Sequence, residues 1–409
     1  MPSRRQVLAV SGAVAAGLAG CSTLDGDPPP VDVRTDQFRS EDLWPSFNGH
    51  SANTAYSPAG RPIRSEPSVA WRAPVDSGLG YPVVGPRRVF YPDGNVLRAF
   101  DAADGTERWR RTAAEPGDES ERGIASPPAY LRRVNIDDGP ELVVVAVAGA
   151  PNELRAYTVG GDPAWRTPTP AGGRPVGGPA YEPRTNRVCV GTTAERVLCV
   201  EGRTGDVAWS RRMFGAVEAV PAMNEKSVIV ATTAGEVYSL ATADGRGIWR
   251  ASLDAGTHCA PAMAGRLTLV IDDGGRLYGL DGTGKTAWRN DLGTVANYLG
   301  VTTDGQRAYF VDPVGGPDEL VAADVRTGER AWSVGIGNTG RLPAVVGDLV
   351  YVASGDTVAA FATGDTGPFE GRRRWHWNPD GRASGPVVAA GGRLFLPVSG
   401  DSNELVALE

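Results

Sequence analysis

A glycine followed four residues later by a tryptophan recurs along the chain. "GRTGDVAW" ends at Trp209, "TADGRGIW" at Trp249 and "VRTGERAW" at Trp332. The pairs with this spacing are Gly105/Trp109, Gly161/Trp165, Gly205/Trp209, Gly245/Trp249, Gly284/Trp288, Gly328/Trp332 and Gly371/Trp375. Successive tryptophans lie 56, 44, 40, 39, 44 and 43 residues apart. A unit repeated about every 42 residues is typical of a β-propeller in which each unit forms one four-stranded blade.

The segments between the tryptophans favour β-strands. Their apolar runs are short and are bounded by Gly, Asp, Asn or Pro, as in "RVCVGTTAERVLCV" and "SVIVATTAGEVYSL". No long stretch carries the apolar periodicity of a helix, so we predict an all-β chain. In each unit the glycine permits a left-handed turn before the last strand. The tryptophan supplies a large ring to bury against the neighbouring blade.

One further unit is divided between the two ends of the sequence. After Trp375 come three apolar segments, "GPVVAAGG", "RLFLPVSG" and "ELVALE", and the missing tryptophan strand is in "PSVAWRAPV". We therefore predict an eight-bladed β-propeller of four-stranded antiparallel blades, whose last blade is closed by the N- and C-terminal segments. Such closure leaves no open sheet edge. The repeat tryptophans are Trp71, Trp109, Trp165, Trp209, Trp249, Trp288, Trp332 and Trp375.

The first residues resemble an export signal rather than part of the fold. Arg4 and Arg5 precede an apolar run that is too short to span a bilayer, as in a Tat signal. "LAGC" resembles a lipobox, in which Cys21 is acylated and becomes the mature N-terminus. We predict a Tat-type lipoprotein signal at 1–21, a polar Pro-rich spacer at 22–42 and the propeller at 43–409. The protein is then expected to be anchored by lipid on the outer face of the cell membrane.

The repeats resemble those of the quinoprotein (PQQ-type) β-propeller family. "DAADGTERW" and "ADVRTGERAW" look like the tryptophan-docking motifs of that family, and "LWPSFNGHSANTAYSP" (43–58) looks like the segment before its first tryptophan strand. The resemblance covers residues 43–409 and implies the propeller fold. Together with the lipoprotein signal it points to the BamB-like members, which are lipid-anchored, eight-bladed, non-enzymatic scaffolds.

Quinone-dependent dehydrogenation is the enzymatic alternative that the resemblance implies. Enzymes of the family hold PQQ in an axial funnel beside a calcium ion and a catalytic aspartate, and many join two adjacent cysteines. In this chain Cys189, Cys199 and Cys259 are all separated, and no position matches the calcium and catalytic pattern. We therefore expect no catalytic residue and no PQQ or other cofactor.

Three motifs that suggest nucleotide or calcium binding have structural interpretations. "GLDGTGKT" (279–286) satisfies the P-loop pattern, but "AWRNDLGT" follows it instead of a helix, so we interpret it as a docking turn. "NIDDGPE" (135–141) and "IDDGG" (271–275) lack the spacing of an EF-hand and are typical of solvated hairpin turns.

Histidine and cysteine positions do not indicate a metal site. His50, His258 and His376 lie in different repeats, and there is no Cys-x-x-Cys or His-x-x-x-His pair. Cys189 and Cys199 flank a turn symmetrically, so they could lie opposite each other on paired strands. Export favours a disulfide, whereas cysteines in strands more often remain buried thiols. We favour the thiols, and either state has a structural role.

The negative net charge and the lack of a recognisable set of catalytic residues in the sequence favour a protein-binding function. The formal net charge of −7 argues against a general affinity for nucleic acid. We predict a monomeric, non-enzymatic scaffold for a protein partner at the membrane surface. The alternatives are a PQQ-dependent dehydrogenase and a receptor for a glycan or small ligand that uses the propeller funnel.

Strand direction predicts which loops share a face of the propeller. Loops between blades and loops between the second and third strands of a blade emerge on one face. Insertions at 113–123, 149–153 and 312–319 all belong to this face, and the first and third are acidic. Because a rigid scaffold positions loops for binding, we predict that this face binds the partner and that acidic residues steer a basic surface. The candidate residues are Asp118, Glu119, Glu121, Asp318 and Glu319.

Overall fold

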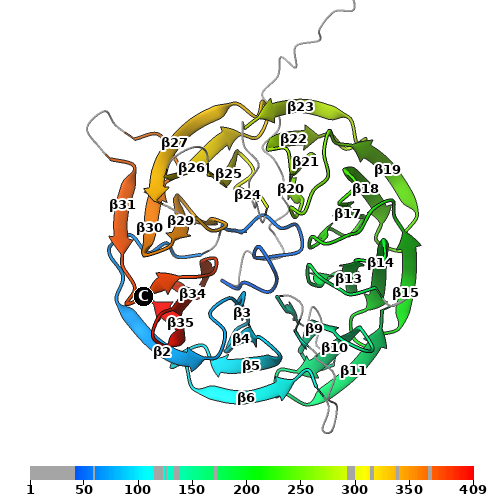
Figure 1. The fold of residues 1–409 in the computed structure, drawn as a ribbon, viewed down its shortest axis with the longest axis horizontal. Coiled ribbons are helices and arrows are strands. Elements are labelled where there is room, and N and C mark those ends of the chain that lie inside the picture. Colours follow the sequence, from blue (N-terminus) through cyan, green and yellow to red (C-terminus); the bar gives the residue numbers. More distant parts are fainter. Residues whose placement is uncertain are drawn as a thin grey trace, which may run out of the picture. The chain divides into compact units, whose positions relative to one another are not determined.

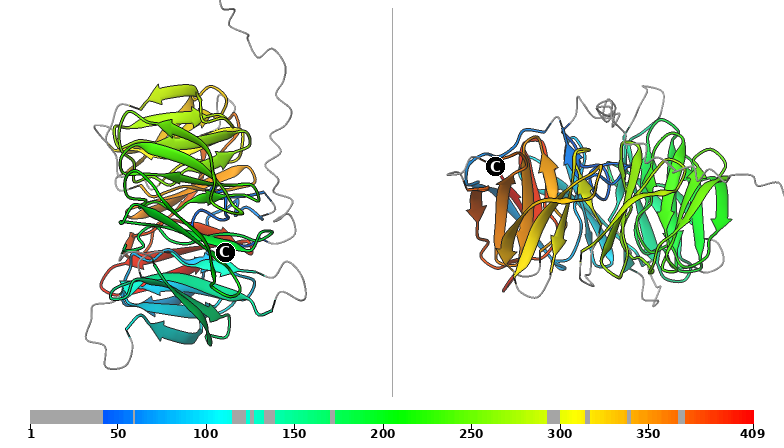
Figure 2. Two further views of the ribbon diagram at one scale, coloured as in Figure 1. Left: turned by 90° about the vertical axis from the view of Figure 1, so that its right-hand side faces the viewer. Right: turned by 90° about the horizontal axis from the view of Figure 1, so that it is seen from above.

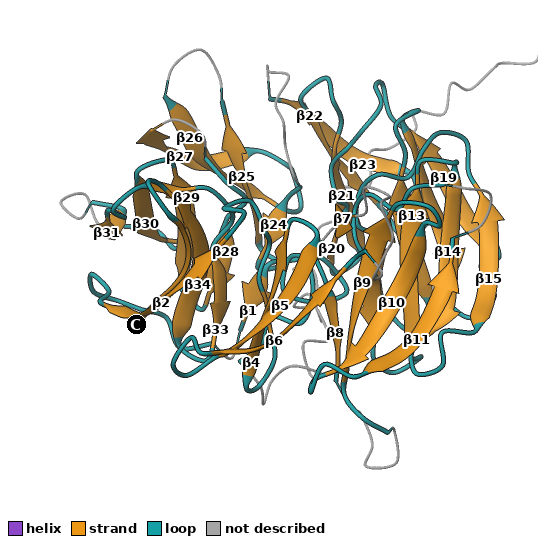
Figure 3. Ribbon diagram, turned by 60° about the horizontal axis from the view of Figure 1, so that its bottom comes forward, coloured by secondary structure: helices purple, strands orange, loops and turns teal. Residues whose placement is uncertain are grey.

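The fold is that of a computed structural model, which describes residues 42–58, 60–114, 123–124, 127–132, 139–169, 173–292, 300–313, 317–337, 340–366 and 371–409. The chain divides into a unit of residues 1–30, which lies outside the described residues, and a unit of residues 31–409. The second unit consists of eight antiparallel sheets arranged around an axis (Figure 1). Among the described residues there is no helix, and therefore none long and apolar enough to cross a membrane (Figure 3).

Each sheet is one blade, and the blades are numbered here in chain order. Blade 1 contains β3 (Val83–Val84), β4 (Arg88–Asp93), β5 (Val96–Asp101) and β6 (Glu107–Thr112). Blade 2 contains β7 (Gly123–Ile124), β8 (Ala129–Leu131), β9 (Leu142–Ala148), β10 (Glu153–Thr158) and β11 (Pro163–Pro168). Blade 3 contains β12 (Ala180–Glu182), β13 (Arg187–Thr192), β14 (Arg196–Glu201) and β15 (Val207–Arg212). Blade 4 contains β16 (Ala222–Met223), β17 (Ser227–Ala231), β18 (Glu236–Ala241) and β19 (Gly247–Ser252).

The remaining four blades follow the same order. Blade 5 contains β20 (Ala262–Ala264), β21 (Leu267–Ile271), β22 (Arg276–Leu280) and β23 (Thr286–Asp291). Blade 6 contains β24 (Thr302–Thr303), β25 (Arg307–Asp312), β26 (Asp318–Asp324) and β27 (Arg330–Gly337). Blade 7 contains β28 (Ala344–Val346), β29 (Leu349–Ser354), β30 (Thr357–Ala362) and β31 (Arg373–Trp377), with β1 (Tyr56–Ser57) added in parallel to β28. Blade 8 contains β32 (Arg382–Ala383), β33 (Val388–Ala390), β34 (Arg393–Ser399), β35 (Asn403–Leu408) and β2 (Val69–Val75).

Blade 8 joins the two ends of the sequence, as predicted. Strand β2 pairs antiparallel with β35, from Val69 opposite Leu408 to Val75 opposite Asn403. In Figure 1, β2 (blue) lies beside β35 (red) on the outside of the ring. The prediction of four strands in a blade holds for the main ladders, and β7, β1 and β32 are short additions to blades 2, 7 and 8. The middle strands of the blades are almost wholly buried, so the apolar core lies between successive sheets (Figure 2).

The repeated glycine and tryptophan meet across neighbouring blades. A Cβ on Gly245 would lie 2.6 Å from the Trp209 ring of the preceding blade, and Gly245 has a φ of +69°. Glycine is therefore required both by the turn and by the close approach of the ring. The other contacts of this kind join Trp71 to Gly105, Trp109 to Gly161, Trp165 to Gly205, Trp249 to Gly284 and Trp288 to Gly328. In most of them the indole Nε1–H also donates to a carbonyl of the same turn, as Trp209 does to Thr242 at 3.0 Å.

The last two tryptophans dock differently. No atom lies within 4 Å of a Cβ built on Gly371, so this glycine does not receive Trp332. Instead the Arg372 guanidinium covers the Trp332 ring at 4.2 Å, and the indole Nε1–H donates to Thr363. The Trp375 indole donates to the carbonyl of Ile63 at 2.7 Å. Ile63 lies in the segment that leads into β2, the outer strand of blade 8. The seventh glycine of the repeat is thus not part of a docking contact.

Replacement of Gly245 by alanine is expected to lower the free energy of unfolding by about 2 to 4 kcal/mol, through the left-handed backbone and the contact with Trp209. Gly247→Ala is the matched control, because a Cβ there meets nothing within 4 Å. Urea unfolding of both variants measures the difference. Equal stability of the two variants would contradict this account of the repeat.

The structure joins Cys189 and Cys199 in a disulfide, which corrects the interpretation as free thiols. The two cysteines lie directly opposite each other on β13 and β14, as the symmetric spacing allowed. Both are buried in blade 3, so the bond links two strands inside the core. Cys259 is a buried thiol, and burial raises its pKa to about 12.

Candidate functional site

The segment 44–57 crosses the axis of the propeller. In Figure 1 it is the dark blue trace at the centre of the ring. Its backbone makes hydrogen bonds with the innermost strands of six blades. The pairs are Trp44 with Val84, Pro45 with Tyr130, Ser51 with Met223, Ala52 with Met263, Thr54 with Thr303, and Ala55 with Val345. Sequence reasoning placed this segment only ahead of the first tryptophan strand and did not predict its position in the channel.

Two side chains fix this axial segment. The Asn53 Nδ2 group donates to the carbonyls of Val220, Pro221 and Pro261, each at 3.1 Å. His50 is buried, its Nδ1 accepts from Ala52 N at 3.3 Å, and its Nε2 lies 2.6 Å from Thr54 Oγ1. This arrangement suits a neutral imidazole, and burial lowers the pKa of His50 to about 4.

The buried imidazole predicts a pH-dependent stability. The pKa of His50 is about 4 in the folded protein, against 6.5 for an unperturbed histidine. The unfolded chain therefore binds more protons in this window, and stability is lost as the pH falls from 6.5 towards 4. Between pH 7.5 and pH 5 the loss from His50 is expected to be about 2 kcal/mol. Urea unfolding of wild type and His50→Gln at both pH values isolates the loss of unfolding free energy that is due to His50. An equal loss in the variant would show that His50 is not its cause.

The interblade face is defined here as the face that carries the loops between blades and the turns between second and third strands. Backbone amides of the interblade loops donate to side chains of these turns. Arg174 N donates to Thr193 Oγ1, Ala216 N to Thr233 Oγ1, and His258 N to Asp273 Oδ1, at 3.1 to 3.2 Å. These contacts confirm the prediction that the two kinds of loop share a face.

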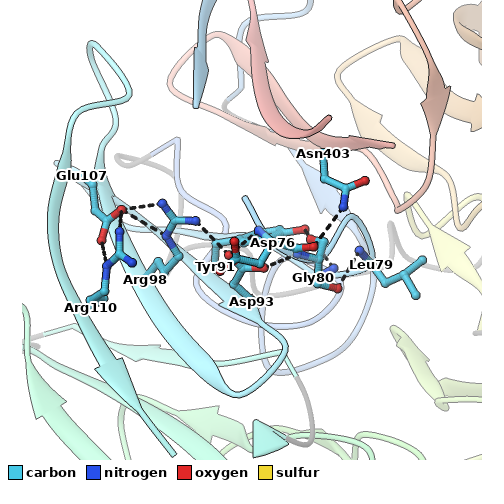
Figure 4. Close-up of polar contacts among 10 residues, drawn as sticks. Asp76, Leu79, Gly80, Tyr91, Asp93, Arg98, Glu107, Arg110 and Asn403 are labelled. Atoms are coloured by element: carbon cyan, nitrogen blue, oxygen red, sulfur yellow. Dashed lines mark hydrogen bonds and ion pairs between the residues drawn. The ribbon is translucent and has the colours of Figure 1, made fainter. Parts of the chain in front are cut away.

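The loop 76–80, between blades 8 and 1, is held by buried polar side chains of blade 1 (Figure 4). The buried Asp93 carboxylate accepts from the amides of Asp76 and Ser77, and from Arg98 Nη1 at 2.9 Å. Tyr91 Oη donates to Ser77 O at 2.6 Å and accepts from Gly80 N at 3.0 Å. A Cβ on Gly80 would lie 2.4 Å from the carbonyl of Pro92, so only glycine fits there. Asp93 and Tyr91 therefore tie the interblade loop to blade 1.

The same network extends to the outer strand of blade 1. Arg98 contacts Glu107 Oε2 through two nitrogens, and Glu107 Oε1 also accepts from Arg110 at 2.6 Å. The pKa of Glu107 is lowered: burial opposes ionisation, but the hydrogen bonds from Arg110 and Arg98 outweigh it. The Glu107 carboxylate is thus charged and paired with two arginines, which suits a structural clamp.

Two large apolar side chains emerge from interblade loops. Leu79 is 70% exposed, and Figure 4 shows its side chain pointing away from the polar network. Phe214, in the loop between blades 3 and 4, is 62% exposed, and its amide donates to Tyr238 Oη at 3.3 Å. Sequence reasoning missed both residues. Their only signal was an apolar residue in a loop beside glycine, in "SGLGY" and "RMFGA".

Charged residues lie on the same face. His258 Nδ1 lies 3.0 Å from Asp273 Oδ2, and its Nε2 lies 3.8 Å from Glu218 Oε2. Glu218 belongs to the loop between blades 3 and 4, His258 to the loop between blades 4 and 5, and Asp273 to the β21–β22 turn of blade 5, so the cluster joins two interblade loops. Among the described residues no group of three His, Cys, Asp or Glu side chains could hold a metal ion.

The structure describes two of the five acidic residues that we predicted to steer a partner. Asp118, Glu119 and Glu121 lie outside the described residues. Asp318 and Glu319 belong to strand β26 rather than to the loop before it. Asp318 is buried and accepts from Gly340 N at 2.6 Å, and Glu319 pairs with Arg330 at 3.2 Å. Asp318 thus binds the backbone between blades 6 and 7 and Glu319 pairs within blade 6, and their role in steering a partner stays a prediction.

The P-loop-like motif at 279–286 and the acidic motif at 271–275 both form turns between strands. The Lys285 motif connects β22 to β23, and its Gly284 receives Trp249, which confirms the docking-turn interpretation. Asp272 and Asp273 follow β21. Asp272 is not solvated as expected: it is buried, and it accepts from Arg276 N and Tyr278 Oη at 2.9 Å each. Residues 135–138 of the other acidic motif lie outside the described residues.

Fold and repeat together define an eight-bladed β-propeller with tryptophan-docking blades. The solved structures that resemble it share this architecture. BamB from Moraxella catarrhalis matches with a TM-score of 0.63 and 17% identity over 84% of this chain and 98% of that one. Quinohemoprotein alcohol dehydrogenase from Comamonas testosteroni matches with a TM-score of 0.71 and 13% identity, over 92% of this chain and 81% of that one. The designed Ika8 protein matches with a TM-score of 0.61 and 12% identity, over 86% and 98%.

Sequence comparison identifies the family. No curated protein matches the chain significantly. The family model described as outer membrane protein assembly factor BamB matches residues 64–150, 150–256 and 233–367, which is more than half of the chain. The chain therefore belongs to this BamB-like family of PQQ-repeat β-propellers.

Proposed function

We propose that the chain is an exported, lipid-anchored scaffold that binds a protein partner through the interblade face. The observation that carries the proposal is the exposure of Leu79 and Phe214 on interblade loops. Asp93 and Tyr91 hold the loop of Leu79, and Tyr238 Oη accepts from the amide of Phe214. Exposed apolar side chains with charged neighbours are typical of interaction surfaces. Rigid loops also lower the entropy lost on binding.

The family supports a binding role. Its description and the name of the Moraxella protein concern outer membrane protein assembly, which requires contact with other proteins. Asp118, Glu119 and Glu121 come between blades 1 and 2 in the sequence, and we include them as charges that steer a basic partner. Anchoring through Cys21 would hold the face at the outer surface of the membrane. Arg4 and Arg5 support export by the Tat route.

The proposal contains no enzymatic step. Two observations support a scaffold without PQQ. Residues 44–57 cross the axis, where the resemblance places the cofactor of quinoproteins, and among the described residues no group of three His, Cys, Asp or Glu side chains could hold a metal ion. The similarity to the quinohemoprotein dehydrogenase is at 13% identity and concerns the fold. An assay with PQQ, calcium and alcohols tests this. Tight PQQ binding and reduction of a dye, both abolished by a chelator, would show that the protein is a dehydrogenase rather than a scaffold.

Capture of the partner tests the proposed face. Leu79→Ser and Phe214→Ser together are expected to reduce cross-linked capture from intact cells at least tenfold, because apolar anchors dominate most interfaces. The matched control combines Val207→Ser and Ile248→Ser, which are 55% and 51% exposed on the outer strands of blades 3 and 4. Both double variants should melt like wild type. Loss of capture in the control alone would mean that the partner binds the outer wall.

A further inference from the structure

A cleft of about 390 Å³ lies between blades 1 and 2, on the opposite face from the interblade loops. Blade 1 contributes the turn between β3 and β4, including Arg87 and Arg88. Blade 2 contributes Tyr130, Glu141 and Val159. The volume is within the range of small-ligand pockets.

At the blade 1 wall of the cleft, Arg88 differs from arginines at the same position of two other blades. Arg393, the first residue of β34, donates to the carbonyls of Ala102 and Ala103 in the following blade, at 3.0 and 2.8 Å. Arg307, the first residue of β25, likewise donates to Thr363 of blade 7. Arg88 holds the same position in β4 but donates within its own blade, to Arg87 O at 2.9 Å and Asp101 Oδ2 at 3.0 Å. Arg88 thus makes no hydrogen bond to the blade 2 turn that contains Val159.

Charges of opposite sign line the two walls. Among the described residues, the exposed Arg87 guanidinium and the Glu141 carboxylate have no ion-pair partner. The buried Arg88 Nε–H has no acceptor there either. Arg88 Nη1 stays bonded to Asp101 and Arg87 O, and its Nε–H is the donor that would gain an acceptor from an anion in the cleft. The blade 1 wall thus suits a carboxylate, and the blade 2 wall suits an ammonium group.

The remaining lining is apolar and aromatic. Pro86 and Val159 contribute aliphatic surface, and the Tyr130 ring lies against Gly85, where a Cβ would be 3.2 Å from the ring. We propose that the cleft binds a small zwitterion with an apolar side chain, the chemistry of a free aliphatic α-amino acid. Arg87 and Arg88 bind the carboxylate, Glu141 binds the ammonium group, and the side chain packs beside Val159. This site is independent of the scaffold role.

Calorimetric titration of the full protein with L-leucine tests the proposal. The matched probes are 4-methylpentanoate, which lacks the ammonium group, and 3-methylbutylamine, which lacks the carboxylate. Leucine is expected to bind at least ten times more tightly than either probe. Absence of leucine binding at millimolar concentration, or equal binding of 4-methylpentanoate, would overturn the proposal.

Variants locate the site. Arg87→Gln and Glu141→Gln are each expected to weaken leucine binding at least tenfold while the melting temperature stays at the wild-type value. Glu141→Gln should also remove the advantage of leucine over 4-methylpentanoate. The control is Arg187→Gln, because Arg187 holds the position of Arg88 in blade 3 and its Nε is also buried without an acceptor. Weakening by the control, with no effect of the two cleft variants, would place the ligand elsewhere.

Discussion

Deletion of residues 67–75 is expected to abolish cooperative folding of the propeller. The deletion removes β2, which completes blade 8 and carries Trp71, the ring that docks on Gly105 of blade 1. It leaves β35 without its outer neighbour and opens the ring at the junction of blades 8 and 1. The expected loss exceeds about 5 kcal/mol, which is a large part of the stability of a typical domain. Circular dichroism and urea unfolding measure it.

Two point variants separate the contribution of the docked ring from that of the surface ion pairs of β2. Trp71→Ala retains the strand but removes the docked ring and its hydrogen bond to Ala102, and is expected to cost about 3 to 5 kcal/mol. Arg72→Gln removes only exposed ion pairs with Asp380 and Glu404, and should cost less than about 1 kcal/mol. A deletion variant with wild-type unfolding would show that the ring is not closed by β2.

Replacement of Cys21 by serine is expected to release the protein from the membrane. In the lipoprotein that we propose, acyl chains on Cys21 supply the anchor, at about 0.8 kcal/mol for each buried methylene. Detergent phase partitioning of wild type and Cys21→Ser measures the change, and the variant should still be exported. Arg4→Lys with Arg5→Lys should separately block export by the Tat route. A Cys21→Ser protein that stays in the detergent phase would contradict the lipoprotein assignment.

The fold could be predicted because its information is local and repeated. Each Gly–Trp pair combines a turn that needs a positive φ with a ring that needs a neighbour, as Gly245 and Trp209 demonstrate. Trp71 near the start and three strands after Trp375 were enough to predict how the ring closes. The repeat did not predict how Trp332 docks, because the Arg372 side chain, and not Gly371, contacts its ring.

The candidate site was less predictable, because it depends on contacts between distant residues. Nothing in the spacing of Asn53 shows that its side chain reaches Val220 and Pro261 across the axis. Asp318 looked like a free loop charge, but the backbone of Gly340, 22 residues later, uses it. Exposure of Leu79 likewise depends on Asp93 and Tyr91, which hold its loop from another blade.

Site-specific photo-cross-linking in intact cells tests the central claim most directly. A benzophenone amino acid is placed singly at Leu79, Phe214, Val207 or Ile248, the first two on the interblade face and the last two on the outer strands. The scaffold account predicts a covalent adduct with the same partner protein from positions 79 and 214, and none from positions 207 and 248. Adducts from positions 207 and 248 alone would contradict it.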